Sequence, residues 1–527
     1  MIVNDAASTP AVEWRPRANP WLIALAVMLA TFMVILDTSI AVVALPYIAG
    51  NLGATRDEST WVLTSYLVAN AIVLPASVWS SGFFGRKRFL IGCTVLFTVA
   101  SLLCGLATSM TMLVAARVLQ GLGGGAMQPL SQAILLESFP PAKRGAATAL
   151  FGIAIVVAPI LGPTLGGWLT DNWSWRWTFY INLPVGVLAF FLMSWLVEDP
   201  PYIRAKRSGR FDSMGFGLVA LWLGTLQIVL DKGQDADWFA AVWLRWFAVI
   251  SVLALAGFIA RELFIQEPLV DLHVFKNRNF TVSCALFGLF GMMLYALITI
   301  QPLFLQSLLG YTAFDAGLSV SPRGFGAFAA LFFVGALVGR VDSRLLSGLG
   351  FAVMGLSSFL LCRLSLQMAM GNVVWANILA GFGTGCLFVP LTTLAVCTLR
   401  NEQIGNAIGL QNLIRNVGGS IGLSLVATLQ ERFAQAHQSF MAGQMSALNP
   451  QYLQHSSALQ HVFEQGSSPL DALARARGLL YNTLLQQSDY WAFMDLFFLV
   501  ACICAGCVLG ILFYEKPRTM HAVAAAE

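Results

Sequence analysis

The sequence predicts an all-α, polytopic membrane protein. Of its 527 residues, 57% are hydrophobic and only 11% are charged. A soluble domain carries about 25% charged residues, so this chain cannot form an ordinary hydrated surface. Many apolar runs of about 20 residues are long enough to cross roughly 30 Å of hydrocarbon. A lipid-exposed segment must satisfy its own backbone hydrogen bonds, so we expect every crossing to be a helix.

Reading each long apolar run as one crossing gives fourteen transmembrane helices. They are expected near residues 21–49, 60–82, 89–108, 111–136, 145–170, 177–197, 214–231, 242–262, 280–307, 317–338, 346–368, 372–398, 404–430 and 490–514.

The connections between these crossings differ in charge. Lys and Arg gather in one alternate set, which includes 86–88 and the basic stretch 198–213. The positive-inside rule therefore predicts that both termini are cytoplasmic. The long segment 431–489 then lies on the outer side, and its apolar register predicts amphipathic helix. It is either a solvated excursion or a docking surface for a partner outside the membrane.

Charged side chains inside the crossings are costly, so each indicates a functional or paired site that faces the bundle interior. At 1.5 Å per residue, Asp37 lies about 24 Å from the cytoplasmic edge and Arg117 about 20 Å. The two depths agree, which favours contact between them. Five such residues stand clearly inside crossings (Asp37, Arg117, Arg323, Arg415 and Asp495).

The second half of the chain repeats this arrangement of charges. Asp495, Arg415 and Arg323 lie about 22, 17 and 21 Å from the inner edge by the same estimate. Each group is either a static ion pair that fixes helix packing or a proton-coupling site. In the second case, a conformational change alters burial and the neighbouring Arg, and so captures or releases a proton.

Nothing in the sequence indicates an enzyme. The glycines of GLGGGAMQ (121–128) suggest close helix packing, because no strand precedes them and they lie within a crossing. No G-x-x-x-x-G-K phosphate loop exists, and we find no catalytic nucleophile–base pair or metal cluster at the membrane level. We therefore expect no cofactor. A pump that lacks ATP machinery must draw on an ion gradient or run downhill.

The stretch GIAIVVAPILGPTLGGWL (152–169) combines small residues and prolines on one helix. Small residues permit close backbone contact, and a proline bends a helix and frees a carbonyl. The stretch is expected to be a kinked packing helix, a seal between two halves, or both. Its key residues are Pro159, Gly162, Pro163, Gly166 and Gly167.

Several motifs resemble the fourteen-span drug:proton antiporters of the major facilitator superfamily, EmrB/QacA type and nearest to EmrB. They are LDTSIAVVALP (36–46), WVLTSYLVANAIVLP (61–75), RVLQG (117–121), PPAKRGAATAL (140–150), APILGPTLGGWL (158–169) and EPLVDLHVF (267–275). The resemblance implies a major facilitator fold. A six-helix bundle over 1–197 would be followed by a cytoplasmic linker (198–213), two extra helices within 214–262, and a second six-helix bundle over 263–527.

The resemblance also implies proton-coupled export of hydrophobic and amphipathic compounds by alternating access. Asp37 corresponds to the family's protonated acid, Arg117 to the base that modulates it, and Gly162, Pro163, Gly166 and Gly167 to the antiporter motif that prevents leak. EmrB-type proteins work in the bacterial inner membrane with a periplasmic adaptor and a TolC-type outer-membrane channel. The segment 431–489 has the position and length for that contact. No nucleic acid is expected as a partner.

One motif departs from the superfamily pattern. The loop after the second helix usually reads G-x-x-x-D-R-x-G-R-K, but VWSSGFFGRKR (78–88) has Gly82 in place of the acid and Phe83 in place of the first base. Gly85, Arg86 and Lys87 remain as a conformational loop. Loss of the acid puts the usual cytoplasmic latch in doubt.

Substrate identity stays open at this stage. The exported compound could be a drug, a fatty acid, a siderophore or a secondary metabolite, and Asp37 could bind a cationic substrate directly. A non-transporting membrane receptor is the alternative from another class. Polar and aromatic residues that could line a cavity are Asn70, Gln120, Tyr295, Gln301, Phe304, Gln306 and Gln411.

Overall fold

The computed structural model describes residues 16–140, 143–200, 212–234, 236–265, 268–337, 341–368, 370–399, 401–446, 448–466 and 468–515. Within these ranges the regular elements are helices, and strands are absent. The principal helices are α1 (Pro20–Leu52), α2 (Arg56–Phe84), α3 (Arg86–Gly105), α4 (Met110–Gly124), α5 (Met127–Ser138), α6 (Arg144–Asn172), α7 (Trp177–Tyr180), α8 (Asn182–Leu196), α10 (Ser213–Lys232), α11 (Val242–Phe264), α12 (Arg278–Ser307), α13 (Ala313–Val320), α14 (Arg323–Leu337), α15 (Ser343–Leu361), α16 (Met370–Val396), α17 (Asn401–Ala442), α18 (Pro450–Glu464) and α19 (Pro469–Gly510).

Local capping fixes where many of these helices begin. The Asn19 side chain accepts from the backbone N–H of Trp21, with Pro20 at the first helical position. Thr55 and Glu58 form a capping box at the start of α2. Gly53 ends α1 in the left-handed conformation, with φ 63°, which glycine adopts without steric cost. Helix boundaries therefore follow from short-range sequence signals.

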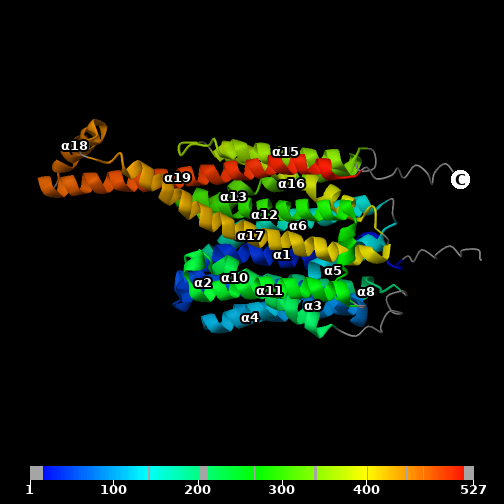
Figure 1. The fold of residues 1–527 in the computed structure, drawn as a ribbon. Helices are drawn as coiled ribbons and strands as arrows, with labels where there is room; N and C mark the ends of the chain where they lie inside the picture. The colour runs from blue at the N-terminus through cyan, green and yellow to red at the C-terminus, as the bar shows by residue number, and fades with distance from the viewer. Residues whose placement is uncertain are drawn as a thin grey trace, which may run out of the picture.

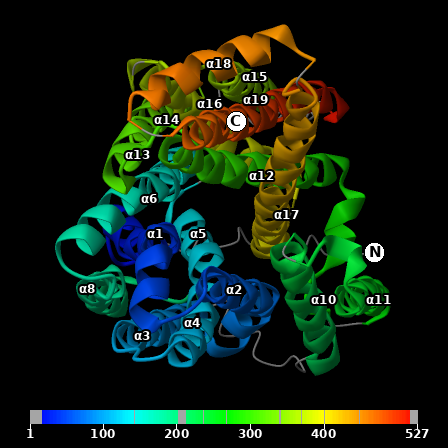
Figure 2. The ribbon, with the colours of Figure 1, turned by 90° about the vertical axis from the view of Figure 1, so that its left-hand side faces the viewer.

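The helices run nearly parallel in one elongated bundle (Figure 1). Seen along its axis, α1 to α8 form one group and α12 to α19 another (Figure 2). The helices α10 and α11 pack against each other at the side of the bundle, where α10 also contacts α2 and α17. The two-bundle arrangement follows the expected major facilitator fold, while the residue boundaries of the domains stay predictions.

Among the described residues, eleven helical segments are long and apolar enough to cross a membrane, by length and composition. They match eleven of the fourteen predicted crossings. The other three positions, 60–82, 111–136 and 404–430, are helical too. There the apolar stretch of α2, Trp61–Ser77, is shorter, the α4–α5 segment is interrupted at Gly125 and Ala126, and α17 carries several polar groups.

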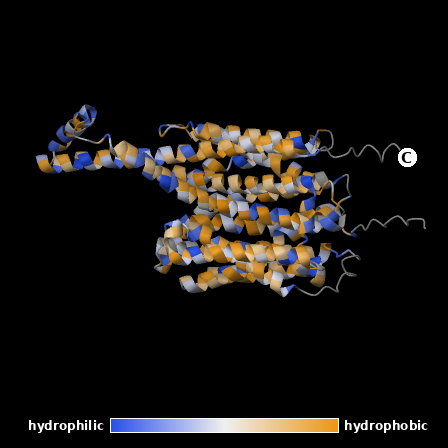
Figure 3. Cartoon of the chain, viewed as in Figure 1, coloured by the Kyte–Doolittle hydropathy of each residue, from blue (hydrophilic) through white to orange (hydrophobic). Residues whose placement is uncertain are grey.

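A helical projection extends beyond one end of the bundle (Figure 1). It consists of the last turns of α17, the separate helix α18 and the first turns of α19, and α18 packs on α19. Hydrophilic residues are frequent along it, whereas apolar residues dominate the bundle (Figure 3). Helix is thus present in the segment 431–489, as its amphipathic register predicts.

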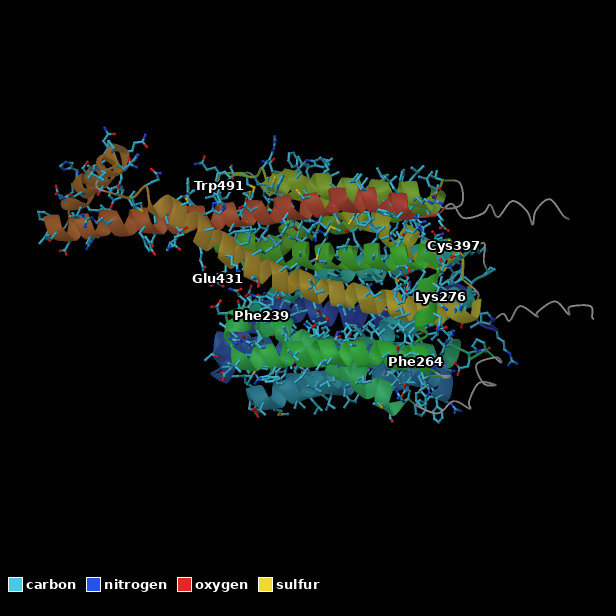
Figure 4. The ribbon with its side chains drawn as sticks, in the orientation of Figure 1. Phe239, Phe264, Lys276, Cys397, Glu431 and Trp491 are labelled. Carbon is cyan, nitrogen blue, oxygen red and sulfur yellow. The ribbon has the colours of Figure 1, made fainter. Side chains whose placement is uncertain are left out.

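Labelled residues identify the two ends of the bundle. Glu431 and Trp491 lie where the projection joins the bundle, and Lys276 and Cys397 lie at the other end (Figure 4). The loop at Gly85 to Lys87 belongs to this second end, because Arg86 lies near Gly405 at the start of α17. Residues 201–211 of the predicted linker lie outside the described residues.

Candidate functional site

A buried ion pair joins α1 to α4 in the first half of the molecule. Nη1 of Arg117 lies 2.6 Å from Oδ2 of Asp37, and both side chains are 0% exposed. The site arises because each helix carries one charge at the same depth within an otherwise apolar span. At low dielectric such a pair interacts strongly, and each partner compensates the desolvation of the other.

The other carboxylate oxygen of Asp37 is also fully engaged. Nε2 of Gln120 donates to Oδ1 over 2.9 Å, and Nδ2 of Asn182 donates to the same atom over 2.8 Å. Asn182 additionally donates to Oγ of Ser101, which donates to the carbonyl of Phe179. Asp37 therefore accepts N–H donors from α4 and α8 and acts only as an acceptor, as an ionised carboxylate does.

Arg117 is held from several directions. Its Nε donates to the carbonyl of Val62 over 2.9 Å, and Nη1 also donates to Oε1 of Gln120 over 2.7 Å. The guanidinium lies over the ring of Tyr66, 4.3 Å from the centroid, and 5.6 Å from that of Phe179. These contacts fix the position of the guanidinium against α2, α4 and α7.

The structure brings Asp37 and Arg117 together, as the depth estimate predicts; their role in proton coupling stays a prediction. Gln120, expected to line a substrate cavity, instead belongs to this network. Sequence reasoning missed Asn182. The available signal was an amide within the apolar run 177–197, which in a span needs a hydrogen-bond partner.

Helix α6 crosses α1 directly beside this network. A Cβ on Gly162 would lie 2.3 Å from Oγ of Ser39, so only glycine permits this approach. Because Pro163 has no N–H, the carbonyl of Pro159 receives no helical hydrogen bond from it. Oγ of Ser39 donates to that carbonyl over 2.8 Å. The segment of α6 from Pro159 to Gly162 thus contacts α1 at Ser39, two residues from Asp37.

The remaining glycines of both motifs also act in packing. Gly166 approaches the backbone of Ile40, and Gly167 lies buried on the same helix. In the 121–128 stretch, a Cβ on Gly121 would lie 2.4 Å from the carbonyl of Tyr66, and one on Gly123 would lie 2.7 Å from the backbone N of Phe97. The expectation of close helix packing, and not of a nucleotide loop, is confirmed.

A cavity lies between α6 of the first half and the helices of the second half. Two of its lining residues are the buried arginines Arg323 and Arg415. The remaining wall is mainly apolar and includes Ile155, Pro159, Phe290, Leu294, Ile298 and Phe388. Pro159 therefore borders the cavity, and its carbonyl accepts from Ser39, which links the cavity to the neighbourhood of Asp37.

The charged group of the second half is arranged differently from expectation. Asp495 does not meet Arg323 or Arg415; its Oδ2 lies 2.7 Å from Nε2 of His437, and its side chain is 45% exposed. The physical reason is that α17 continues as one helix to Ala442, which carries His437 alongside α19. The second half thus has no counterpart of the Asp37–Arg117 pair among its described residues.

Within the described part of the chain, the walls of this cavity include none of the seven predicted cavity residues. Gln301 accepts from Arg323, and Gln411 donates to the carbonyl of Leu391. Phe304 packs against Phe493 and Phe497 in the core. Of the others, Asn70 donates to the Tyr66 hydroxyl, Tyr295 packs beside Gly419, and Gln306 is exposed.

The loop from Gly85 to Lys87, which follows the position where Gly82 replaces the usual acid, contacts two carboxylates from other segments. Arg86 forms an ion pair with Glu137 at the end of α5. The backbone N–H of Lys87 donates to Oδ1 of Asp199 over 2.8 Å, which places a carboxylate at the N-terminus of α3. Gly85 has φ 89° and leaves room for Asp199. These contacts tie α3 to α5 and to the segment that follows α8.

This fold, with its buried charges in crossing helices and a cavity between two bundles, is that of a membrane transporter. A family model described as the Major Facilitator Superfamily matches residues 27–423, and the chain belongs to that superfamily. It is a multi-pass membrane transporter and not an enzyme.

Individual members of the superfamily are similar to this chain over nearly its whole length. The chain is 35% identical to "Multidrug export protein EmrB" of Escherichia coli over 94% of this chain and 95% of that protein. It is 36% identical to "Fatty acid resistance protein FarB" of Neisseria gonorrhoeae, over 94% and 96%. It is 31% identical to "Colistin resistance protein EmrB" of Acinetobacter baumannii, over 96% and 98%.

Among the solved structures that share the fold is a bacterial homologue of the human lysosomal transporter Spinster, in an inward-facing and unoccupied conformation. The TM-score is 0.53 at 16% identity, with 94% of this chain and 99% of that chain covered.

Proposed function

We propose that this protein is a proton-coupled antiporter that exports hydrophobic and amphipathic compounds across the bacterial inner membrane by alternating access. No cofactor is involved, and the proton gradient supplies the energy. The observation that carries the proposal is the chain of contacts from Asp37 to the cavity. Ser39, two residues from Asp37, donates to the carbonyl of Pro159, and Pro159 borders the cavity.

The proposed mechanism uses Asp37 in two states. As an anion it accepts from Arg117, Gln120 and Asn182, which holds α1, α4 and α8 together. Protonation removes the charge that these donors stabilise, and the low dielectric makes that loss large. Because α6 packs on α1 beside Asp37, a shift of α1 alters the cavity wall. The similarity of this chain to the multidrug export protein EmrB of Escherichia coli supports drug efflux as the transport activity.

The test is transport by the full chain in liposomes. A lipophilic dye is followed under an imposed pH gradient for the wild type, Asp37→Asn and the control Asp237→Asn, at an exposed position between α10 and α11. We expect uphill transport by the wild type and the control, while Asp37→Asn binds dye without accumulating it. Full-rate pumping by Asp37→Asn would contradict the proposal, and Asp495 would be the next candidate.

The projection supports a role in a tripartite pump with a periplasmic adaptor and a TolC-type channel, which requires both termini to be cytoplasmic. Leu448 and Leu470 are 93% and 82% exposed there. A photoreactive residue at Leu448 should crosslink a co-expressed adaptor protein. A photoreactive residue in place of Phe264, which is exposed at the opposite end of the bundle, should not crosslink the adaptor. Equal crosslinking at both positions would contradict this assembly.

A further inference from the structure

The arginines of the cavity differ from Arg117 in their electrostatic compensation. Arg323 and Arg415 are each 3% exposed. Among the described residues, neither forms an ion pair with a carboxylate, whereas Arg117 is paired with Asp37. A buried cation without a counter-ion is expensive in a membrane interior.

Arg323 has neutral partners only. Its Nη2 donates to Oε1 of Gln301 over 2.5 Å and to Oδ1 of Asn377 over 3.2 Å. Nε of Arg323 and Nε2 of Gln301 are buried and lack a hydrogen-bond partner among the described residues. Arg323 is also the first residue of α14, where the helix dipole adds positive potential. Local structure therefore intensifies the positive charge at this point.

Arg415 repeats the pattern on α17. Its Nη2 donates to Oε1 of Gln128 over 2.9 Å and to Oδ1 of Asn416 over 3.2 Å. Within the described residues its Nε has no partner, and neither does Nε2 of Gln128. Gln128 belongs to α5 of the first half. An anion bound at Arg415 would thus lie at the contact between the two halves.

We propose that Arg323 and Arg415 bind the anionic head group of an amphipathic substrate, in the first instance a long-chain carboxylate. The unpartnered N–H groups supply donors, and two guanidinium groups supply the compensating charge. Phe290, Leu294, Ile298 and Phe388 form an apolar wall beside the arginines, against which the part of the hydrocarbon chain next to the head group can pack. This inference rests on the proposed function, since it names the substrate class of that transporter.

The same charges disfavour a cationic substrate in this cavity. Like charges in a region of low dielectric repel strongly, and no described carboxylate lines the cavity. Asp37 cannot substitute in this conformation, because its side chain is fully buried and its oxygens already accept from Arg117, Gln120 and Asn182. The cavity therefore selects by charge as well as by hydrophobicity.

The first experiment needs only the wild-type protein in nanodiscs without a gradient. Displacement of radiolabelled laurate is measured for laurate, methyl laurate and dodecylamine, with binding to protein-free nanodiscs subtracted. We expect laurate to bind at least about tenfold more tightly than either analogue, since charge-assisted hydrogen bonds contribute that much. Equal displacement by all three ligands would overturn the proposal.

The second experiment uses Arg323→Gln, Arg415→Gln and the control Arg363→Gln, an exposed residue after α15. Each cavity variant should weaken laurate binding about ten- to a hundredfold and leave methyl laurate unchanged. Arg323→Lys and Arg415→Lys keep the charge and should retain part of the selectivity. Equal weakening for both ligands, or an equal effect of Arg363→Gln, would overturn the proposal.

The same preparation separates this inference from the proposed function. Uphill dye transport without laurate selectivity would overturn the anion site alone. Laurate selectivity without transport driven by a pH gradient would overturn proton coupling alone.

Discussion

The two halves of the protein bury their charges in opposite ways. In the first half, Arg117 is matched by Asp37 and the network is almost closed. In the second half, Arg323 and Arg415 have only neutral partners and face a cavity. A buried ion pair with all its charges compensated stabilises one conformation. A buried cation without a counter-ion favours the binding of an anionic ligand. The halves therefore suit different tasks within one transport cycle.

The largest expected effect is on the free energy of unfolding, when the paired and the unpaired arginine are each replaced. Arg117→Met leaves Asp37 buried without its counter-ion and should lower the free energy of unfolding by about 3–5 kcal/mol. Arg323→Met removes an uncompensated charge, so it should be neutral or stabilising. Unfolding of the ligand-free protein in detergent micelles, followed by tryptophan fluorescence, measures both. Equal destabilisation by the two variants would contradict the contrast.

The neutral donors around Asp37 should have the next largest effect. Gln120→Ala and Asn182→Ala should each cost about 1–3 kcal/mol, because each leaves a lone pair of a buried carboxylate without its donor. The cost should shrink when Asp37→Asn is already present, since the neutral amide demands less compensation. The control Gln306→Ala, at an exposed position, should change stability by less than about 0.5 kcal/mol. Strict additivity with Asp37→Asn would refute the network.

The close contact between α1 and α6 can be tested by adding a methyl group at Gly162. Gly162→Ala places a methyl group against Ser39 and should cost about 1–3 kcal/mol through overpacking, with a loss of dye transport. Gly217→Ala on α10 is the matched control, because a Cβ there meets no atom within 4 Å. The control should be neutral or slightly stabilising, as alanine favours helix. Unchanged stability and transport in Gly162→Ala would show that this approach is dispensable.

The smallest expected effect concerns the Ser39 hydroxyl. Ser39→Ala removes the hydrogen bond to the Pro159 carbonyl and should cost about 1 kcal/mol. Ser307→Ala removes a hydroxyl bonded within its own exposed helix turn and should cost less. The same unfolding assay compares the two. A larger cost for Ser307→Ala would indicate that the α1–α6 contact is weak.

The sequence by itself determined the membrane class, the helical crossings and the meeting of Asp37 with Arg117. These depend on local hydrophobic length and on counting depth along a straight helix, and both are short-range properties of the chain. The glycine motifs also revealed their packing role, because a missing side chain in a span has few other uses.

Only the tertiary structure decided which polar groups share a site. Asn182, Gln120 and Asp37 lie far apart in the sequence and meet because α8 and α4 pack beside α1. Asp495 met His437 instead of an arginine because α17 continues beyond its apolar run. The cavity and its two arginines likewise depend on how α6, α12, α14, α16 and α17 face one another. The depth of a residue can be counted along its own helix. Which side of each helix faces its neighbours depends on the packing of all the helices together.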